Sequence, residues 1–222
     1  MAITLNGNTI HLAGNFITKG KKAPNFHLVQ TDLSEFCLND KINDYLILNI
    51  FPSLDTNTCA SSVRKFNKIA SEVPGYKVLC ISKDLPFAHN RFCVSEGIEN
   101  VITLSDFRYD SDFGIKYGLL ITDGPLKGLL ARAVIINNPK GEILYTQLVP
   151  EISHEPNYEE IISFIKSTRF LISTSFAKMI LIPLVSPVRI SSRDVSNAIV
   201  AILNRLLYSA FGFSATSLHA FS

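Results

Sequence analysis

A cysteine at the junction of a buried strand and a helix is the first candidate for chemistry in this sequence. Cys59 follows the uncharged apolar run 45–51 and a short polar loop, and after it apolar residues recur at spacings of three and four. The run is typical of a strand buried on both faces of a sheet, which Pro52 ends because proline has no N–H to donate. The later spacing predicts a helix, which places Cys59 in its first turn.

The first turn of a helix is a favourable position for a reactive thiol. Its unpaired backbone N–H groups and the positive end of the helix dipole both favour an anion. The thiolate is such an anion, and it is the nucleophilic form of cysteine. The polar loop before Cys59 and the exposed geometry of strand-to-helix turns favour reactivity. The alternative is a buried cysteine that packs as a small hydrophobic residue, and residue chemistry alone leaves both open.

The residues around this cysteine carry a resemblance to a known family. Pro52, Thr56 and Cys59 match the P-x-x-x-T-x-x-C signature of the peroxiredoxins. The wider sequence resembles one bacterial branch, the thiol peroxidases, which are atypical two-cysteine peroxiredoxins. Matches recur in order from about residue 3 to about residue 166, in segments 48–56, 60–67, 78–82, 84–88, 91–93, 100–105, 123–129 and 131–134.

The resemblance implies a role for each matching site residue. Cys59 would attack a peroxide oxygen and become a sulfenic acid, which the resolving Cys93 would convert to an intramolecular disulfide. Thr56 would place its hydroxyl beside the sulfur and the peroxide, the Cys59 N–H would help to hold the peroxide oxygens, and Pro52 would shield the thiolate. Arg132 matches the family's arginine beside the thiolate. Alternatively, this arginine leans out at the end of an apolar strand or pairs with a core carboxylate.

The chain has four cysteines, and their spacing leaves alternatives to Cys93 as the resolving thiol. Cys80 competes, but it lies within an apolar strand and could not swing out without breaking the sheet. Cys93 itself could be a half-buried apolar thiol. Because a disulfide needs Cα atoms within about 4.4–6.8 Å, and both Cys59 and Cys93 are expected near helix starts, we expect local unfolding in each cycle. Cys37 has no predicted partner, and without C-x-x-C spacing a zinc site is not expected.

The resemblance also implies partners. Thioredoxin would reduce the disulfide by thiol–disulfide exchange, the substrates would be hydrogen peroxide or alkyl hydroperoxides, and the chain would form a homodimer. No haem, flavin or metal cofactor is expected. A competing hypothesis is a thiol sensor or holdase on the same fold that oxidises without rapid turnover. A thioredoxin-type oxidoreductase would need the C-x-x-C motif, which is missing.

The composition of the chain argues against several classes of protein. Hydrophobic residues make up 47% of the chain and charged residues 18%, with a net charge of +2, so a substantial core is expected and nothing suggests a nucleic-acid partner. No apolar run reaches the roughly 20 residues that a membrane-spanning helix needs. The N-terminus lacks the basic start and apolar core of a secretory signal. The expected location is the cytoplasm, where structural disulfides are unusual.

The order of predicted elements indicates an α/β, thioredoxin-like fold, with a central mixed sheet flanked by helices and an added N-terminal β-hairpin. The expected strands are 26–30, 45–51, 76–82, 101–104, 131–136 and 142–148, the hairpin is 3–12, and the expected helices begin at Cys59 and cover 87–96, 111–117 and 155–166. We expect a peroxiredoxin domain over 1–168. The extension 169–222 lies beyond the family pattern, has no predicted role, and has helical spacing over 194–208.

Overall fold

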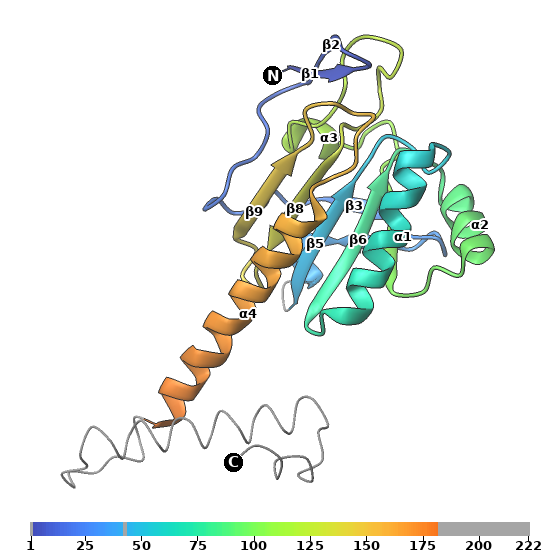
Figure 1. Ribbon diagram of the computed structural model, residues 1–222. Helices are drawn as coiled ribbons and strands as arrows, with labels where there is room; N and C mark the ends of the chain where they lie inside the picture. Colours follow the sequence, from blue (N-terminus) through green and yellow to red (C-terminus); the bar gives the residue numbers. More distant parts are fainter. Residues whose placement is uncertain (1, 42–43, 182–222) are drawn as a thin grey trace, which may run out of the picture. The chain divides into compact units, whose positions relative to one another are not determined.

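A mixed sheet of seven strands forms the centre of the first part of the chain (Figure 1). The structure, a computed structural model, describes residues 2–41 and 44–181. The chain divides into two compact units, Met1–Ser167 and Thr168–Ser222, and the described strands all lie in the first. The sheet consists of β3 (His27–Val29), β4 (Glu35–Cys37), β5 (Tyr45–Ile50), β6 (Tyr76–Ser82), β7 (Val101–Ser105), β8 (Ala133–Asn137) and β9 (Ile143–Leu148).

The strand order is β4-β3-β7-β6-β5-β8-β9, with parallel pairing only at the centre. β5 pairs parallel with β6, and β6 with β7, whereas β8 runs antiparallel to β5 on its other side. The N-terminal hairpin, β1 (Ala2–Leu5) and β2 (Asn8–His11), forms a separate two-stranded sheet. Its turn residues have positive φ angles, 51° at Asn6 and 78° at Gly7, as a tight hairpin turn requires.

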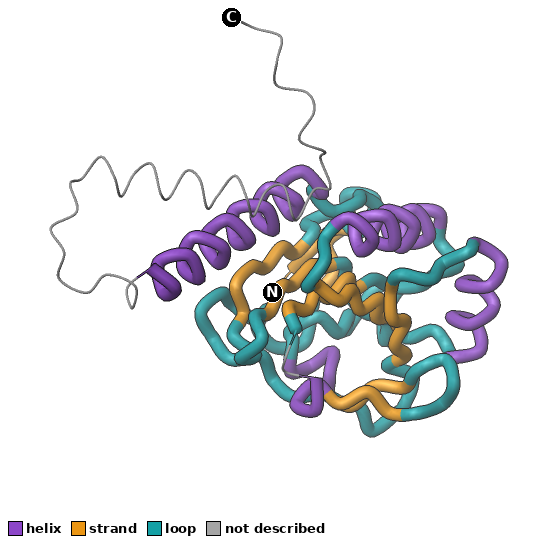
Figure 2. The backbone as a smooth tube through the Cα atoms, turned by 90° about the horizontal axis from the view of Figure 1, so that it is seen from below, coloured by secondary structure: helices purple, strands orange, loops and turns teal. Residues whose placement is uncertain are grey.

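Helices cover one face of the sheet, and a short helix and the hairpin cover the other (Figure 1 and Figure 2). The helices are α1 (Asn57–Glu72), α2 (Pro86–Glu96), α3 (Phe113–Lys116) and α4 (Tyr158–Leu181), with a 3-10 turn at Leu38–Lys41. Consecutive strand residues point to opposite faces. Val78 of β6 therefore belongs to the hydrophobic cluster that includes residues of α1, α2 and the start of α4, whereas Leu79 belongs to the cluster that includes residues of α3 and the hairpin.

The predicted fold class is confirmed, although several elements differ from the expected ones. The helix expected over 155–166 begins at Tyr158 and continues to Leu181, because no proline or glycine interrupts it, so the expected domain boundary falls inside α4. Strand β4 was not predicted, since three residues are too few to show an alternating pattern.

The helical spacing over 194–208 lies outside the described residues. In the described part of the chain, no helix has both the length and the apolar character to span a membrane.

A buried histidine in α2 makes the stability of the fold depend on pH. His89 is 1% exposed, and its Nε2 lies 3.0 Å from the Ser82 hydroxyl. Burial lowers the pKa of His89 to about 4, although the nearby Asp84 carboxylate opposes this shift. An unfolded chain would bind a proton here near pH 6.5, well before the native state does. Native stability should therefore fall as the pH drops from about 6.5 to about 4, by up to about 3 kcal/mol.

Denaturant unfolding at about pH 7 and about pH 4.5 tests this expectation. Acidification should lower the free energy of unfolding by about 2–3 kcal/mol more for the wild type than for His89→Gln, which has no group to protonate. The comparison with the variant removes the contribution of the carboxylates, because they titrate in both proteins. Equal losses in the two proteins would show that native His89 takes up its proton as readily as the unfolded chain does.

Candidate active site

Cys59 occupies the third position of α1 and has no exposed surface. The N-cap is Thr56, whose backbone is extended and whose Oγ1 accepts a hydrogen bond from the Cys59 N–H at 3.4 Å. In a capping box, the third helical position holds an acidic side chain close to the unpaired N–H groups. Here a thiol takes that position, and the first turn contains no acidic residue. The predicted placement of Cys59 in the first turn of a helix is confirmed.

A buried arginine faces the sulfur. Arg132 is 2% exposed, and its Nη2 donates to the Cys59 Sγ at 3.3 Å. Nε and Nη2 also donate to the Ile152 carbonyl, at 3.1 and 3.0 Å, and Nη1 is buried without a hydrogen-bond partner. Among the described residues, the ion pairs include none between this arginine and a carboxylate. The positive charge therefore faces the sulfur with no carboxylate at ion-pair distance, although, against the effect of burial, it helps to lower the pKa of Glu155.

Strand pairing explains how two residues so distant in sequence meet. Ala133, the first residue of β8, pairs with Ile50, the last residue of β5. Arg132 precedes β8 and so stands beside the end of β5, where the chain turns into α1. The expected strand over 131–136 was therefore wrong at its start, since the arginine lies just before the ladder. The alternatives of an outward-leaning arginine or a core ion pair do not describe this geometry.

Thr56 and Pro52 stand on the loop that leads into α1. The Thr56 hydroxyl donates to the Ser53 carbonyl at 3.2 Å while accepting from the Cys59 N–H. Both groups that were expected to hold the peroxide thus bind each other as a helix cap, and the cap must open before either can bind a substrate oxygen. Pro52 is buried where β5 ends.

Cys93 lies on a different helix, and the structure does not join it to Cys59. Both thiols are free. Cys93 is half-buried, with its sulfur 3.9 Å from the Thr103 hydroxyl, and burial raises its pKa although that hydroxyl opposes the shift. The expectation that it stands near a helix start was wrong, because α2 begins at Pro86 and Cys93 falls in its second half.

The other two cysteines have different surroundings. Cys80 is fully buried in β6, where burial raises its pKa to about 12 although the Asn49 amide donates to its sulfur. It is thus a neutral core thiol, as predicted. Cys37 is half-buried, with its sulfur 3.6 Å from the Asn25 side-chain oxygen. Over residues 2–41 and 44–181, no group of three or more metal-ligating side chains gathers.

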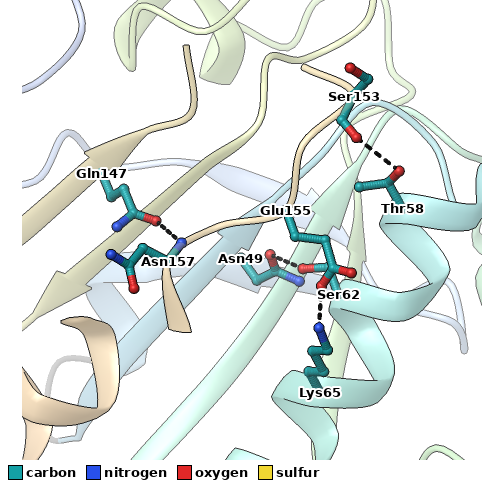
Figure 3. Close-up of polar contacts among 8 residues, drawn as sticks. All are labelled: Asn49, Thr58, Ser62, Lys65, Gln147, Ser153, Glu155 and Asn157. Carbon is teal, nitrogen blue, oxygen red and sulfur yellow. Dashed lines mark hydrogen bonds and ion pairs between the residues drawn. The ribbon is translucent and has the colours of Figure 1, made fainter. Parts of the chain in front are cut away.

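The loop between β9 and α4 lies against the start of α1, a contact that was not predicted. Figure 3 shows the Thr58 hydroxyl donating to the Ser153 carbonyl, at 3.1 Å, and Lys65 paired with Glu155 at 2.7 Å. The same loop supplies the Ile152 carbonyl that binds the buried arginine. The contacts of this loop with α1 span 95 and 90 residues of sequence, and no local motif encodes them.

A buried amide helps to hold α1 on the sheet. Asn49 of β5 is fully buried, and its side-chain oxygen accepts from the Ser62 hydroxyl of α1 at 3.1 Å (Figure 3). Buried amides need such partners. The sequence signal for this contact was available, because Asn49 is an amide inside an otherwise apolar run. Figure 3 also shows Gln147 of β9 accepting from the Asn157 N–H at 2.9 Å, just before α4 begins.

Comparisons with known proteins agree with this geometry. The redoxin family matches residues 18–162. The thiol peroxidase of Mycobacterium bovis is 50% identical over 157 residues, which cover 71% of this chain and 93% of that protein, and the Mycobacterium tuberculosis thiol peroxidase matches equally well.

Solved structures show the same relationship. The crystal structure of a peroxiredoxin-like protein from Aquifex aeolicus has a TM-score of 0.71 and 43% identity, over 75% of this chain and 96% of that one. Thiol peroxidase from Chromobacterium violaceum has a TM-score of 0.70 over 76% of this chain and 98% of its own, but at 22% identity it supports the fold alone. The 50% identity to the mycobacterial thiol peroxidases extends over 93% of their length, and this shows membership of the same family, not only the same fold. The chain belongs to the redoxin family, among the thiol peroxidases, the peroxiredoxin enzymes that reduce peroxides with cysteine thiols.

Proposed function

We propose that Cys59 is the peroxidatic nucleophile of this enzyme. Its thiolate would attack one peroxide oxygen, the O–O bond would break, and the other oxygen would leave as an alcohol or water after taking a proton. The sulfur would then carry a hydroxyl group, as a sulfenic acid. The observation that supports this assignment best is the 3.3 Å contact between the Arg132 guanidinium and the Cys59 sulfur, in a site closed to solvent.

Arg132 is proposed to act on both charges of the reaction. Its buried guanidinium is placed to stabilise negative charge on the sulfur before attack. Its Nη1, which has no partner, can donate to the oxygen on which charge develops as the O–O bond breaks. Because the site excludes water, these interactions are stronger than they would be at the surface.

Thr56 and Pro52 are proposed to complete the substrate site. Cys59 has no exposed surface, so peroxide can reach its sulfur only when the Thr56 cap turns aside, a movement that leaves Ser53 and Leu54 bound to Asp84. That movement would turn the Thr56 hydroxyl from the Ser53 carbonyl toward the peroxide and would free the Cys59 N–H as a second donor. Pro52 would keep bulk water from the thiolate.

Cys93 is proposed to resolve the sulfenic acid. Its thiol would attack the Cys59 sulfur, forming a disulfide and releasing water. The two cysteines lie on separate helices, so α2 must unwind locally to bring their Cα atoms within about 4.4–6.8 Å. α2 is poorly anchored for such a change, since its fully buried residues are only Pro86 and His89.

Thioredoxin is the proposed reductant of this disulfide, with hydrogen peroxide and organic hydroperoxides as substrates. We further propose a homodimer in the cytoplasm. Large apolar side chains are exposed at Leu85 and Phe87, at the start of α2, and at Phe107 and Tyr109, after β7, and such surfaces favour association. The Asp106 N–H donates to the Ser82 carbonyl at 2.8 Å, which brings these two loops to the same edge of the sheet.

The proposed domain division remains 1–168 for the peroxiredoxin domain and 169–222 for the extension. Two observations support it. The family match ends at residue 162, and the chain divides into its compact units between Ser167 and Thr168.

Peroxide-dependent NADPH oxidation with thioredoxin and thioredoxin reductase tests the cycle. The wild type should turn over continuously. Cys93→Ser should consume about one peroxide per chain and stop at a sulfenic acid that dimedone traps, because no thiol remains to displace the hydroxyl group. Cys80→Ser is the matched control, and it should keep most of its activity because Cys80 is a neutral buried thiol.

Two outcomes would contradict the proposal. Continuous turnover by Cys93→Ser would mean that another thiol resolves the sulfenic acid. Failure of the wild type to turn over, although a Cys59–Cys93 disulfide forms on oxidation, would indicate a thiol sensor or a different reductant, which dithiothreitol in place of thioredoxin would distinguish.

A further inference from the structure

A carboxylate outside the proposed catalytic set joins the loop before Cys59 to the segment before α2. Asp84 lies between β6 and α2. Its Oδ1 accepts from the Ser53 hydroxyl at 2.8 Å, and its Oδ2 accepts from the Leu54 N–H and the Ser82 hydroxyl, both at 2.7 Å. Hydrogen bonds to a charged acceptor are among the stronger ones in proteins.

On one side, these bonds continue to Cys59. The Ser53 carbonyl accepts from the Thr56 N–H at 3.3 Å and from the Thr56 hydroxyl at 3.2 Å. Thr56 in turn caps α1 by accepting from the Cys59 N–H. The Asp84 carboxylate therefore holds the turn from Ser53 to Thr56, and Thr56 binds the backbone N–H of Cys59, the proposed nucleophile.

On the other side, the bonds continue into α2. The Ser82 hydroxyl gives its proton to Asp84, so the hydrogen-bond network assigns the proton on Nε2 to His89, which donates to Ser82 Oγ at 3.0 Å. The other ring nitrogen, Nδ1, is then a buried acceptor without a partner. His89 is thus the buried polar anchor of a helix that buries little else.

The parallel pairing of β5 and β6 explains why these segments meet. Ile50 pairs with Ile81, so both strands end at the same edge of the sheet and both helices start there. Among the ion pairs of the described residues, Arg64 with Glu96 also joins α1 to α2. These two side chains are 48% and 32% exposed. An ion pair this exposed contributes little. The less exposed of these ties therefore runs through the half-buried Asp84.

We propose that Asp84 is a positioning residue, a latch that makes the loop before Cys59 and helix α2 open together. This inference rests on the proposed Cys59–Cys93 cycle. While the latch holds, Cys93 stays away from the Cys59 sulfenic acid, which can then react with a second peroxide to give a sulfinic acid and an alcohol or water. When the latch opens, the same sulfenic acid reacts with the Cys93 thiol to give the disulfide and water. The latch therefore sets the partition between resolution and over-oxidation.

Asp84→Asn tests the latch with little change in shape. The amide keeps one acceptor oxygen, but it removes the negative charge that strengthens all three hydrogen bonds, and its NH₂ group cannot accept where the second oxygen was. Loss of one hydrogen bond to a charged group should raise the population of the open state about tenfold or more. Ser53→Ala removes one of the three bonds to the carboxylate, together with the bond that Ser53 accepts from the Asp55 N–H, and it serves if Asp84→Asn folds poorly.

Amide hydrogen exchange of the reduced protein reads the latch directly, without catalysis. Asp84→Asn should lower protection about tenfold both in 53–59 and in 86–96. Asp123→Asn is the matched control, because Asp123 is also a carboxylate bound by hydrogen bonds, in its case to His11 of the hairpin, far from both segments in sequence. Protection lost in neither segment, or in only one, would overturn the proposal.

Rapid quenching with an alkylating agent, followed by mass spectrometry, measures how the Cys59 sulfenic acid divides between disulfide and sulfinic acid. After one equivalent of hydrogen peroxide, the disulfide should form about tenfold faster in Asp84→Asn, and less sulfinic acid should accumulate at high peroxide. A disulfide rate equal to or below that of the wild type would overturn the restraining role. If the wild type itself formed no Cys59–Cys93 disulfide, the proposed function would fail, and the exchange result would still decide whether the two segments are coupled.

Discussion

Replacing Cys59 with serine is expected to abolish peroxide turnover, by at least roughly a thousandfold, while the fold is kept. The serine hydroxyl is nearly isosteric with the thiol but is not ionised at neutral pH and is a far weaker nucleophile. It can occupy the same third position of α1 with the Thr56 cap intact. Coupled NADPH oxidation gives the rate, and denaturant unfolding should show a change of less than about 1 kcal/mol.

Cys37→Ser is the matched control for this experiment. Cys37 is also a free thiol, half-buried on β4 and outside the site, so the same atomic change there should leave turnover within about twofold of the wild type. Turnover retained by Cys59→Ser would mean that a different thiol attacks the peroxide. Turnover lost by both variants would point to a general effect on the fold.

Replacing Arg132 with methionine is expected to lower the rate of peroxide reaction about 10²–10³-fold, because a preorganised charged donor is lost from the reacting atoms. The effect on stability should be much smaller. Loss of the donors to the Ile152 carbonyl costs about 1–3 kcal/mol, but removal of a buried charge with an unpaired nitrogen offsets part of that cost. We expect the free energy of unfolding to change by less than about 2 kcal/mol.

Arg132→Lys separates charge from geometry in this prediction. Lysine keeps the positive charge but lacks the planar fork with which arginine binds the carbonyl and the sulfur together. The rate should therefore fall between those of the wild type and Arg132→Met. Stopped-flow measurement of the peroxide reaction, before disulfide formation, isolates this step. A loss of stability large enough to account for the loss of rate in Arg132→Met would indicate a structural role for the arginine.

Local patterns were sufficient where the structure depends on neighbours in sequence. The apolar run of β5, the polar loop and the helical spacing of α1 placed Cys59 correctly, because strand ends and helix caps are set within a few residues. The start of β8 and the length of α4 were less predictable. A strand ends where its partner ends, and a helix continues until a residue breaks it.

Burial of the cysteines was only partly predictable. Cys80 could be assigned to the core because it lies within a continuous apolar strand. Cys93 was predicted to lie in a helix over 87–96, within one residue of the observed Pro86–Glu96, and its half-burial agrees with the alternative of a half-buried apolar thiol.

The amino-acid sequence by itself determined the local frame of this protein: a buried strand, a capped helix start, and a thiol at its third position beside the family signature. The tertiary structure alone decided what surrounds that thiol. Antiparallel pairing of β8 with β5 brings Arg132 to a sulfur 73 residues away, and parallel pairing of β5 with β6 brings Asp84 to Ser53. Such contacts depend on strand order and register, which are properties of the assembled sheet and which no local spacing encodes.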